Sequence, residues 1–290
     1  MFNKCKLHTS RLWSTVFVVC CLLPSHVKQK AWADALFSTN DIECSIDMVI
    51  SHFSEPADQT VALVLRAAEA LPQATFRVYL FCQAGDILPR VLGMVPSDWN
   101  VTLLPNVNRE AHAYLAYLRD HIRASSDFVW FTQAAPNGAK PHSLYLWSRL
   151  RHLSHRTGML ALCGVGATAC DNWTDGVRIL ELFALTQRRF CTDADRWSVF
   201  FNGEFIVSRK RIRAQPAWLY DALWNASNTE DAYRRLDVRA AATSRLANYT
   251  FAFIMERGWN LVFGCLVPDY VPRKHLQDLM HRERYFQCLD

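Results

Sequence analysis

The residues best suited to chemistry form one polar cluster: Asn106, Asn108, Arg109, Glu110 and His112. The cluster marks a turn from a predicted strand into a predicted helix. Backbone N–H groups and the positive end of the helix dipole converge on such a turn, which suits it to bind phosphate or carboxylate groups. Asn108 tolerates a positive φ and can make the turn, while Arg109 can bind a diphosphate through both arms of its guanidinium.

The same cluster also has a purely structural interpretation, which the sequence leaves open. Asn108 would then cap the helix, and Arg109 and Glu110 would form ion pairs within the protein. The two interpretations differ in whether an open pocket lies beside the Arg109 guanidinium.

Four strings of the chain resemble, in order and spacing, the signature of a largely fungal and protist family, domain of unknown function 3431. The first string contains the polar cluster and runs from Leu104 to Leu115. The others occupy residues 129–136 with His142, then 205–212 and 256–264, so the resemblance covers about residues 46–264. The family has no settled activity, and the resemblance therefore implies a fold and not a reaction.

The chain departs from the family's pattern at three positions. Asn108 and Ala134 stand where the family has glycine, and Thr132 replaces leucine. Asparagine is a mild replacement, whereas Ala134 places a methyl group where a ligand would approach the backbone closely.

The order of elements in this family looks like that of GT-A glycosyltransferases, which bind a donor diphosphate at the strand ends of a Rossmann-like sheet. The analogy implies a nucleotide-sugar donor and a glycan or protein acceptor. Trp259 would stack on a sugar face, although such an aromatic is more often core. The predicted donor-binding residues are Asn106, Asn108, Arg109, Glu110, His112, Gln133, His142, Arg209, Arg211 and Trp259.

The metal chemistry of that analogy is incomplete in this chain. Metal-dependent GT-A enzymes place D-x-D after the strand equivalent to residues 128–132, but here that strand ends in Gln133. The D-x-D of this chain is Asp193-Ala194-Asp195, in a loop-rich stretch. Binding of Mn or Mg there is one prediction. Metal-independent chemistry, with arginines 109, 209 or 211 neutralising the diphosphate, is at least as well supported.

An inverting transfer needs a carboxylate to take the acceptor's proton. Glu256 is the first candidate for this base and Glu204 the second. Either acid is also typical of a helix surface or of a structural ion pair, and the run from Arg209 to Arg213 is equally typical of a solvated helix entry.

Strands and helices alternate over residues 46–156, which predicts an α/β fold with a Rossmann-like, mostly parallel sheet flanked by helices, a GT-A-like three-layer sandwich. We expect strands at 46–53, 75–81, 101–104, 128–132 and 198–207, and a loop-rich stretch at 163–196. Helices are expected at 58–71, 110–124, 141–156, 216–225, 238–256 and 272–286.

The basic charge of the chain comes from its first 33 residues. These hold five of the 32 Lys and Arg residues and no acid, so residues 34–290 carry 27 cations against 27 acids. This balance argues against a nucleic-acid partner. The short apolar run that ends at Pro24 predicts a signal peptide over 1–33, or a short type II anchor, before one luminal domain over 34–290. We therefore expect a secreted protein, or one resident in the Golgi or ER lumen.

Cysteines and sequons agree with a secretory compartment. Seven cysteines follow the leader, and Cys163 with Cys170 is the expected short disulfide loop, although several of the thiols are also typical of buried core. Four sequons predict glycans at Asn100, Asn172, Asn225 and Asn248.

The sequence thus predicts a glycosyltransferase of the secretory pathway. The competing hypothesis, favoured by the missing D-x-D and by Ala134, is a catalytically silent secreted or Golgi-resident binding protein that retains the fold. A hydrolase has little support, because no G-x-S-x-G string or suitably spaced acid pair occurs.

Overall fold

The computed structural model describes residues 42–124, 126–135, 143–169, 180–192, 195–228, 250–266 and 287–290. Several predictions lie outside these residues: the leader, the sequons at Asn172 and Asn248, and the roles of His142, Cys170 and Asp193. No helix in the described ranges is long and apolar enough to cross a membrane.

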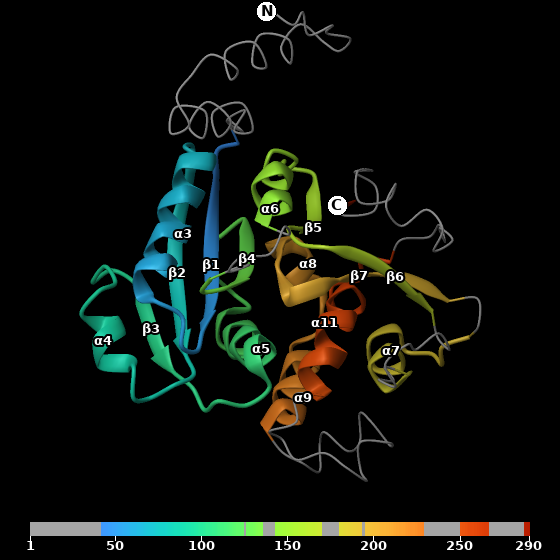
Figure 1. The fold of residues 1–290 in the computed structure, drawn as a ribbon. Coiled ribbons are helices and arrows are strands. Elements are labelled where there is room, and N and C mark those ends of the chain that lie inside the picture. Colours follow the sequence, from blue (N-terminus) through green and yellow to red (C-terminus); the bar gives the residue numbers. More distant parts are fainter. Residues whose placement is uncertain are drawn as a thin grey trace, which may run out of the picture.

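A seven-stranded mixed sheet in the order β3-β2-β1-β4-β8-β5-β9 forms the centre of the molecule (Figure 1). The strands β1 (Cys44–His52), β2 (Ala74–Cys82), β3 (Asn100–Leu103) and β4 (Phe128–Gln133) are parallel. The pairs formed by β8 (Phe205–Ser208), β5 (Thr157–Ala161) and β9 (Gln287–Leu289) are antiparallel. Two further strands, β6 (Val165–Ala169) and β7 (Arg196–Phe200), pair by themselves. The predicted α/β class is confirmed, with a parallel core and an antiparallel side.

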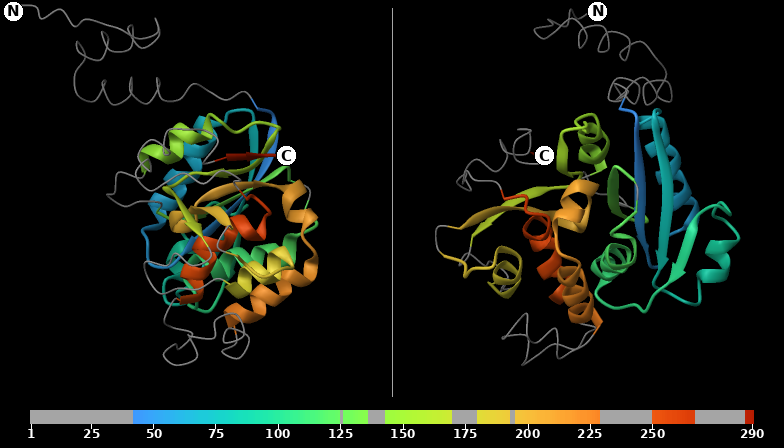
Figure 2. Two further views of the ribbon diagram at one scale, coloured as in Figure 1. Left: turned by 90° about the vertical axis from the view of Figure 1, so that its right-hand side faces the viewer. Right: turned by 180° about the vertical axis from the view of Figure 1, so that it is seen from behind.

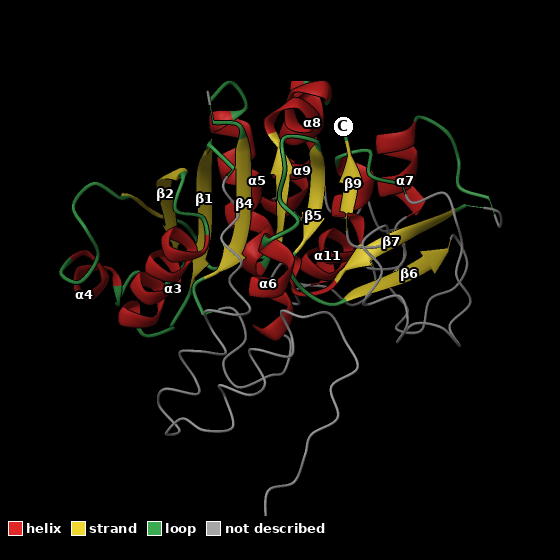
Figure 3. Cartoon of the chain, turned by 90° about the horizontal axis from the view of Figure 1, so that it is seen from above, coloured by secondary structure: helices red, strands yellow, loops and turns green. Residues whose placement is uncertain are grey.

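Helices cover both faces of the sheet and make three layers (Figures 2 and 3). On one face lie α3 (Ala57–Ala70) and α6 (Ser143–Leu150). On the other, α5 (Arg109–His121) packs against β1 and β4, and α9 (Ala217–Asn228) packs against α5. The helix α11 (Thr250–Val262) contacts α5, β7 and α7 (Leu180–Gln187). Two short helices, α4 (Leu88–Leu92) and α8 (Arg209–Ala214), connect strands or follow them.

The strand order reverses direction beside β1. From β1 the chain moves outward to β2 and β3, and then returns to place β4 on the other side of β1. The connections that follow β1 and β4 therefore lead away from each other. In open α/β sheets such a switch point leaves a crevice beyond the carboxyl ends of the strands, which is where ligands bind. The topology thus points to the edge where β1, β2 and β4 end.

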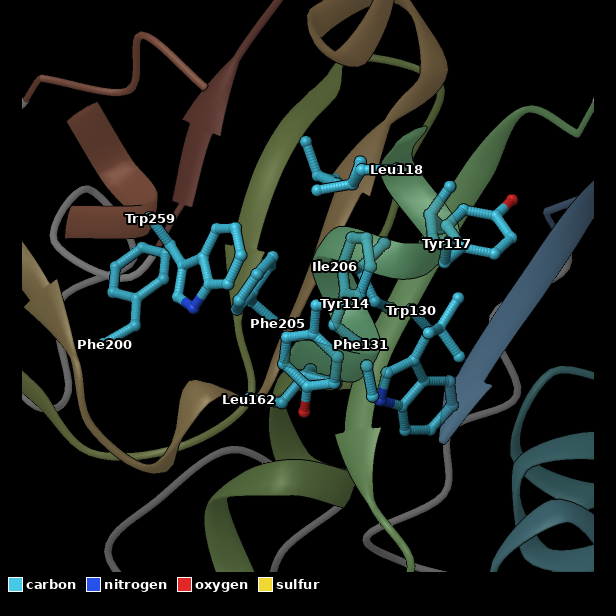
Figure 4. Close-up of a cluster of buried hydrophobic side chains, with 14 of the residues drawn as sticks. Tyr114, Tyr117, Leu118, Trp130, Phe131, Leu162, Phe200, Phe205, Ile206 and Trp259 are labelled. Carbon is cyan, nitrogen blue, oxygen red and sulfur yellow. The ribbon is translucent and has the colours of Figure 1, made fainter. Parts of the chain in front are cut away.

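Aromatic side chains fill the space between α5, α11 and the sheet (Figure 4). The Tyr114 ring on α5 lies 4.9 Å from Phe131 of β4, and Trp259 of α11 lies 5.7 Å from Phe205 of β8. Trp259 is only 1% exposed. It therefore belongs to the core, as its alternative interpretation held, and presents no face on which a sugar could stack.

Arg209 is buried in a network that connects the two halves of the sheet. Its Nη2 lies 3.0 Å from a carboxylate oxygen of Asp47 on β1 and donates to Tyr117 of α5 at 2.8 Å. Its Nη1 donates to the carbonyl of His121 in the last turn of α5 at 3.1 Å. The predicted donor-binding role of Arg209 does not fit this placement, because its guanidinium is saturated inside the protein.

Arg211, the other predicted arginine of this run, is also structural. It pairs with Asp290 at 2.8 Å and donates to the carbonyls of Gly264 and Leu289. These bonds tie α8 to β9 and to the end of α11, and Arg211 does not line the pocket described below. A solvated helix entry fits only Lys210 and Arg213, which are exposed.

The second half of the chain departs most from the predicted elements. The expected strand at 198–207 is two strands, β7 and β8, separated by the 3-10 helix η1 (Phe201–Gly203). The break occurs at Asn202 and Gly203, whose φ values of 64° and 62° are incompatible with a strand. The stretch 163–196 contains β6 and α7, and the helix expected over 141–156 ends at Leu150 because β5 begins at Thr157.

The structure corrects the predicted disulfide. Cys163 is a free, fully buried thiol that donates to the carbonyl of Glu204 at 3.3 Å, and burial raises its pKa. Cys265 and Cys288 form a disulfide instead, which links the chain just after α11 to β9. Spacing along the sequence suggested a short loop at Cys163, but that residue follows directly from the buried strand β5.

We predict that Asp47→Asn destabilises the protein by about 3–5 kcal/mol, because it leaves the Arg209 guanidinium buried without its counter-charge. Urea unfolding measures the effect. Asp120→Asn is the matched control, since it breaks an exposed ion pair with Arg119 and should cost less than about 1 kcal/mol. Equal effects of the two substitutions would contradict the proposed importance of the buried network.

Candidate functional site

A pocket of about 210 Å³ opens at the switch point of the sheet. Its wall comes from the carboxyl ends of β1, β2 and β4 and from the start of α5. The lining residues are Ser51, Phe53, Glu55, Gln83, Asn106, Arg109, Glu110 and Gln133. Four of these, Asn106, Arg109, Glu110 and Gln133, belong to the donor-binding set expected from the sequence.

The entry to α5 has an unusual backbone. Asn108 and Arg109 have φ values of 51° and 52°, so two consecutive residues other than glycine adopt the left-handed conformation. Such residues cost on the order of 1–3 kcal/mol each and persist only where their surroundings hold them. Here the Asn108 Nδ2 donates to the carbonyl of Ser227 at 2.7 Å, and the Gln83 Nε2 donates to the carbonyl of Arg109 at 2.6 Å.

Two observations at the start of α5 bear on the two interpretations of the cluster. The expected positive φ of Asn108 is confirmed, and its side chain makes no capping hydrogen bond to α5. Arg109 is exposed and borders an open pocket, so it is not a guanidinium buried against acids of its own protein.

Glu110 is the acid at the buried side of the pocket, with only 8% of its surface exposed. Burial raises the pKa of its carboxyl to about 7; the nearby Glu256 also raises it, while a backbone hydrogen bond and Arg109 lower it. The effect of burial on the pKa is larger than that of the helix N-terminus, which stabilises the ionised carboxylate by about 1 kcal/mol or less. Near neutral pH this carboxyl can both accept and release a proton, which is the property of a general base.

The 3-10 helix η1 packs against Glu110. A Cβ added to Gly203 would lie 3.4 Å from Glu110 Cγ, so the backbone of η1 is in van der Waals contact with this acid, and the φ of 62° is what favours glycine at this position. The carbonyl of Asn202 accepts a hydrogen bond from Gln133 at 3.2 Å, and its N–H donates to Glu256 at 2.9 Å. Glu110, Gln133 and Glu256 are thus held around one short segment.

The two acids expected to act as the base do not line the pocket. Glu256 binds the backbone of η1 through Oε1 and is not among the lining residues. Glu204 is 1% exposed, and its backbone carbonyl accepts from Leu162 N–H. The acid that does line the pocket is Glu110, which the sequence had suggested only for donor binding.

Two further predicted residues point elsewhere. His112 is fully buried, stacks on Trp224 and bonds Ser227 Oγ at 3.1 Å, and burial lowers its pKa to about 4. It fixes α5 to α9 and does not face the pocket. Asp195 binds Arg189 and the backbone of Thr192. It therefore organises its own loop, while its D-x-D partner Asp193 lies outside the described residues.

Sequence reasoning missed four lining residues: Ser51, Phe53, Glu55 and Gln83. Ser51 and Gln83 lie at or just beyond the carboxyl ends of neighbouring parallel strands, and this placement was the signal that could have revealed them. Glu55 lies a few residues further on, and its carboxylate accepts backbone hydrogen bonds from Phe53 and Ser54 at 2.7 and 3.1 Å.

The pocket does not provide an evident metal site. Among the described residues, no group of three or more His, Cys, Asp or Glu side chains could hold a metal ion. The pocket offers two carboxylates, Glu55 and Glu110, of which Glu55 already binds backbone N–H groups. Within the described chain, the positive groups that border the pocket are the Arg109 guanidinium and the N-terminus of α5.

Comparisons with known proteins give distant likenesses among solved structures alone. No protein-family model matches the chain, and no curated protein matches it. Among solved structures, the mannosyltransferase PcManGT from Pyrobaculum calidifontis, in complex with GDP-Man and Mn2+, is similar to this chain at 13% identity. The match covers 92% of this chain and 88% of that chain, with a TM-score of 0.32. The resemblance to domain of unknown function 3431 remains a prediction.

We predict that Glu110→Gln changes the pH dependence of stability. The Glu110 carboxyl keeps its proton up to about pH 7 in the folded chain, but only up to its ordinary pKa of 4.5 in the unfolded chain. The stability of the fold with respect to this group is therefore highest below pH 4.5. It falls as the pH rises through 7, by about 3 kcal/mol in total.

Urea unfolding at about pH 5 and pH 8 measures this effect. The wild type should lose more stability than Glu110→Gln between the two pH values, and the exposed Glu69→Gln on α3 controls for the loss of a negative charge. An identical loss in wild type and Glu110→Gln would show that the carboxyl is already ionised at pH 5.

Proposed function

We propose that the chain is a glycosyltransferase that binds a nucleotide sugar at the carboxyl-end pocket and transfers the sugar to a glycan or protein acceptor. The observation that carries the proposal is the convergence of Arg109, the α5 N-terminus and Glu110 on one pocket at the switch point. This arrangement supplies an anion-binding group and a proton acceptor at the position where α/β sheets bind ligands.

The donor diphosphate would bind at the start of α5. Arg109 would contact its oxygens through the guanidinium, and the helix dipole would add to the attraction. A pocket of about 210 Å³ is small beside the roughly 300–1,000 Å³ of typical ligand sites, so it would hold the diphosphate and part of the sugar. Phe53, 44% exposed at the rim, is placed to stack on the remainder of the donor.

Glu110 would act as the base in a single displacement. The acceptor hydroxyl oxygen forms a bond to the anomeric carbon as the bond from that carbon to the diphosphate oxygen breaks. The hydroxyl proton passes to the Glu110 carboxylate, and the nucleoside diphosphate leaves with the electron pair. Arg109 stabilises the charge that develops on the leaving group. No step depends on a metal ion, and Mn or Mg would have to be held by donor phosphates or by residues outside the described ranges.

Glu256 would position the site. The Glu256 carboxylate accepts a hydrogen bond from the Asn202 N–H and so holds η1 against Glu110. Its negative charge also raises the pKa of Glu110. This role differs from that of a base in direct contact with the acceptor, and the two roles make different predictions for Glu256→Gln.

The secretory pathway is the proposed compartment. The apolar leader supports it, as do the exposed sequon asparagines Asn100 and Asn225 and the disulfide between Cys265 and Cys288.

The second candidate function is a silent binding protein of the same fold. Gln133 at the end of β4 and the buried Ala134 after it favour that candidate, because neither side chain supplies the carboxylate with which a D-x-D holds a metal ion.

We predict that a UDP- or GDP-sugar raises the melting temperature of the purified protein, with or without manganese. Saturation to about a hundredfold over Kd stabilises by about 2.7 kcal/mol. Arg109→Ala should abolish the shift, whereas Arg66→Ala, an exposed arginine on α3, should leave it unchanged. If no donor shifts the wild type, the proposed pocket does not bind nucleotide sugars.

We predict that Glu110→Gln retains the donor-induced shift and loses turnover by about 10²–10⁴-fold, the usual contribution of a general base. Release of nucleoside diphosphate measures turnover. In the wild type, turnover should rise with pH through about 7, because Glu110 must lose its proton to act as a base.

Glu256→Gln separates the two possible bases. If Glu110 is the base, Glu256→Gln should keep turnover and move its pH profile to lower pH, since a negative charge that raises the Glu110 pKa is removed. Loss of turnover in Glu256→Gln, with full turnover in Glu110→Gln, would assign the base to Glu256. Donor binding without turnover in the wild type would support the silent binding protein.

A further inference from the structure

A second and larger cavity, of about 710 Å³, lies at the opposite edge of the sheet from the carboxyl-end pocket. It opens where β4 begins and β8 ends, beside the turn that leads into β5. None of its lining residues is shared with the first pocket. Its volume falls within the range of small-molecule sites, roughly 300–1,000 Å³. The nucleotide-sugar binding proposed above does not involve this second cavity.

Exposed basic side chains line this cavity. Arg156 and His155 approach from the turn before β5, and Lys210 and Arg213 from α8. Within the described residues, no carboxylate forms an ion pair with the side chains of Arg156, Lys210 or Arg213. Arg213 is held in place because its Nη2 donates to the carbonyl of Ala124 at 2.8 Å.

The acids of the cavity are bound to other groups. Asp290 pairs with Arg211 and accepts from Ser208 Oγ at 2.5 Å, so its charge is compensated. Asp127 accepts the N–H and the hydroxyl of Ser45, both at 2.7 Å. These hydrogen bonds, with a smaller contribution from the nearby His155, lower the pKa of Asp127.

The balance of charge at the cavity is therefore positive. Arg209 lines its inner wall, but its charge is compensated by Asp47. Three exposed cations, Arg156, Lys210 and Arg213, then face Asp127, the lining carboxylate that forms no ion pair with an arginine of the described residues. Arginine and lysine gathered on a concave surface suit phosphate or sulfate oxygens, which arginine can bind with two parallel hydrogen bonds.

We propose that this basic cavity, formed around Arg156, Lys210 and Arg213, is a second binding site for a small anionic ligand that carries phosphate or sulfate groups. This cavity and the donor pocket lie at opposite ends of α5, so the two sites are separate. Arg109 and Glu110 of the donor pocket begin the helix, whereas Arg209 of the basic cavity donates to the carbonyl of His121 in the last turn. An anion bound here would lie against α8 and the start of β4.

Calorimetric titration of the full chain tests the proposal, with inorganic pyrophosphate and inorganic sulfate as probes. All titrations use an Arg109→Ala background, so that binding at the donor pocket does not contribute. The test variant is Arg156→Gln with Lys210→Gln. The matched control is Arg66→Gln with Arg90→Gln, which removes two exposed arginines from α3 and α4, outside the cavity.

The test variant should bind at least one probe roughly tenfold more weakly than its parent, as expected for lost charge-assisted hydrogen bonds, while the control pair binds it like the parent. Preference for pyrophosphate would assign the site to phosphate groups, and preference for sulfate to sulfate groups. Equal weakening in both variants, or no binding of either probe to the parent, would overturn the proposal. If the double variant does not fold, Lys210→Gln alone serves, because Lys210 is exposed and makes no ion pair with a described carboxylate.

Discussion

The buried pair of Arg209 and Asp47 is the interaction on which the geometry of the molecule depends. Asp47 lies in the middle of β1, and Arg209 follows β8, so the pair joins the parallel and the antiparallel sides of the sheet. Through Tyr117 and the carbonyl of His121 the same guanidinium holds the last turns of α5. Burying two charges is costly, and such a pair contributes more to specifying one arrangement than to net stability.

Fixing the last turn of α5 also fixes its first turn, because a helix of 13 residues is a rigid rod. That first turn carries Arg109 and Glu110, about 20 Å away by the helical rise of 1.5 Å per residue. At this end the strained backbone of Asn108 and Arg109 is held by bonds to Ser227 and Gln83. The pocket is therefore pre-organised from both ends of one helix, which lowers the cost of ordering it when a ligand binds.

The protonation of Glu110 follows from the same architecture. A helix N-terminus and a neighbouring arginine both favour the ionised carboxylate, yet burial against η1 outweighs them and brings the pKa to about 7. A more exposed acid at this position would stay ionised and would be a weaker base, since an effective base has a pKa near the working pH. The left-handed Gly203 contributes to this burial because it lets the chain turn at η1, which packs against the acid.

Local patterns in the sequence predicted the first half of the fold, where β1, α3, β2 and β4 show clear periodicity and α5 begins at a recognisable turn. They also predicted the left-handed Asn108 and four of the pocket residues. The second half was harder, because η1 interrupts a run of strand-forming residues through two backbone angles, and Cys265 pairs across 23 residues. Such features depend on contacts distant in sequence.

The strings that resemble domain of unknown function 3431 have different structural roles. For this reason the resemblance alone did not separate core residues from pocket residues. The string at 205–212 supplies a strand, the Ser208 cap of α8 and the buried Arg209, and the string at 256–264 supplies core aromatics and the left-handed Gly264. These are requirements of the fold. The string at 104–115 differs, because its first residues face an open pocket while its later residues form core. A residue in such a string is therefore a candidate for function only where it borders a pocket, and here that condition selects Arg109 and Glu110 over Arg209, Arg211 and Trp259 as donor-binding candidates.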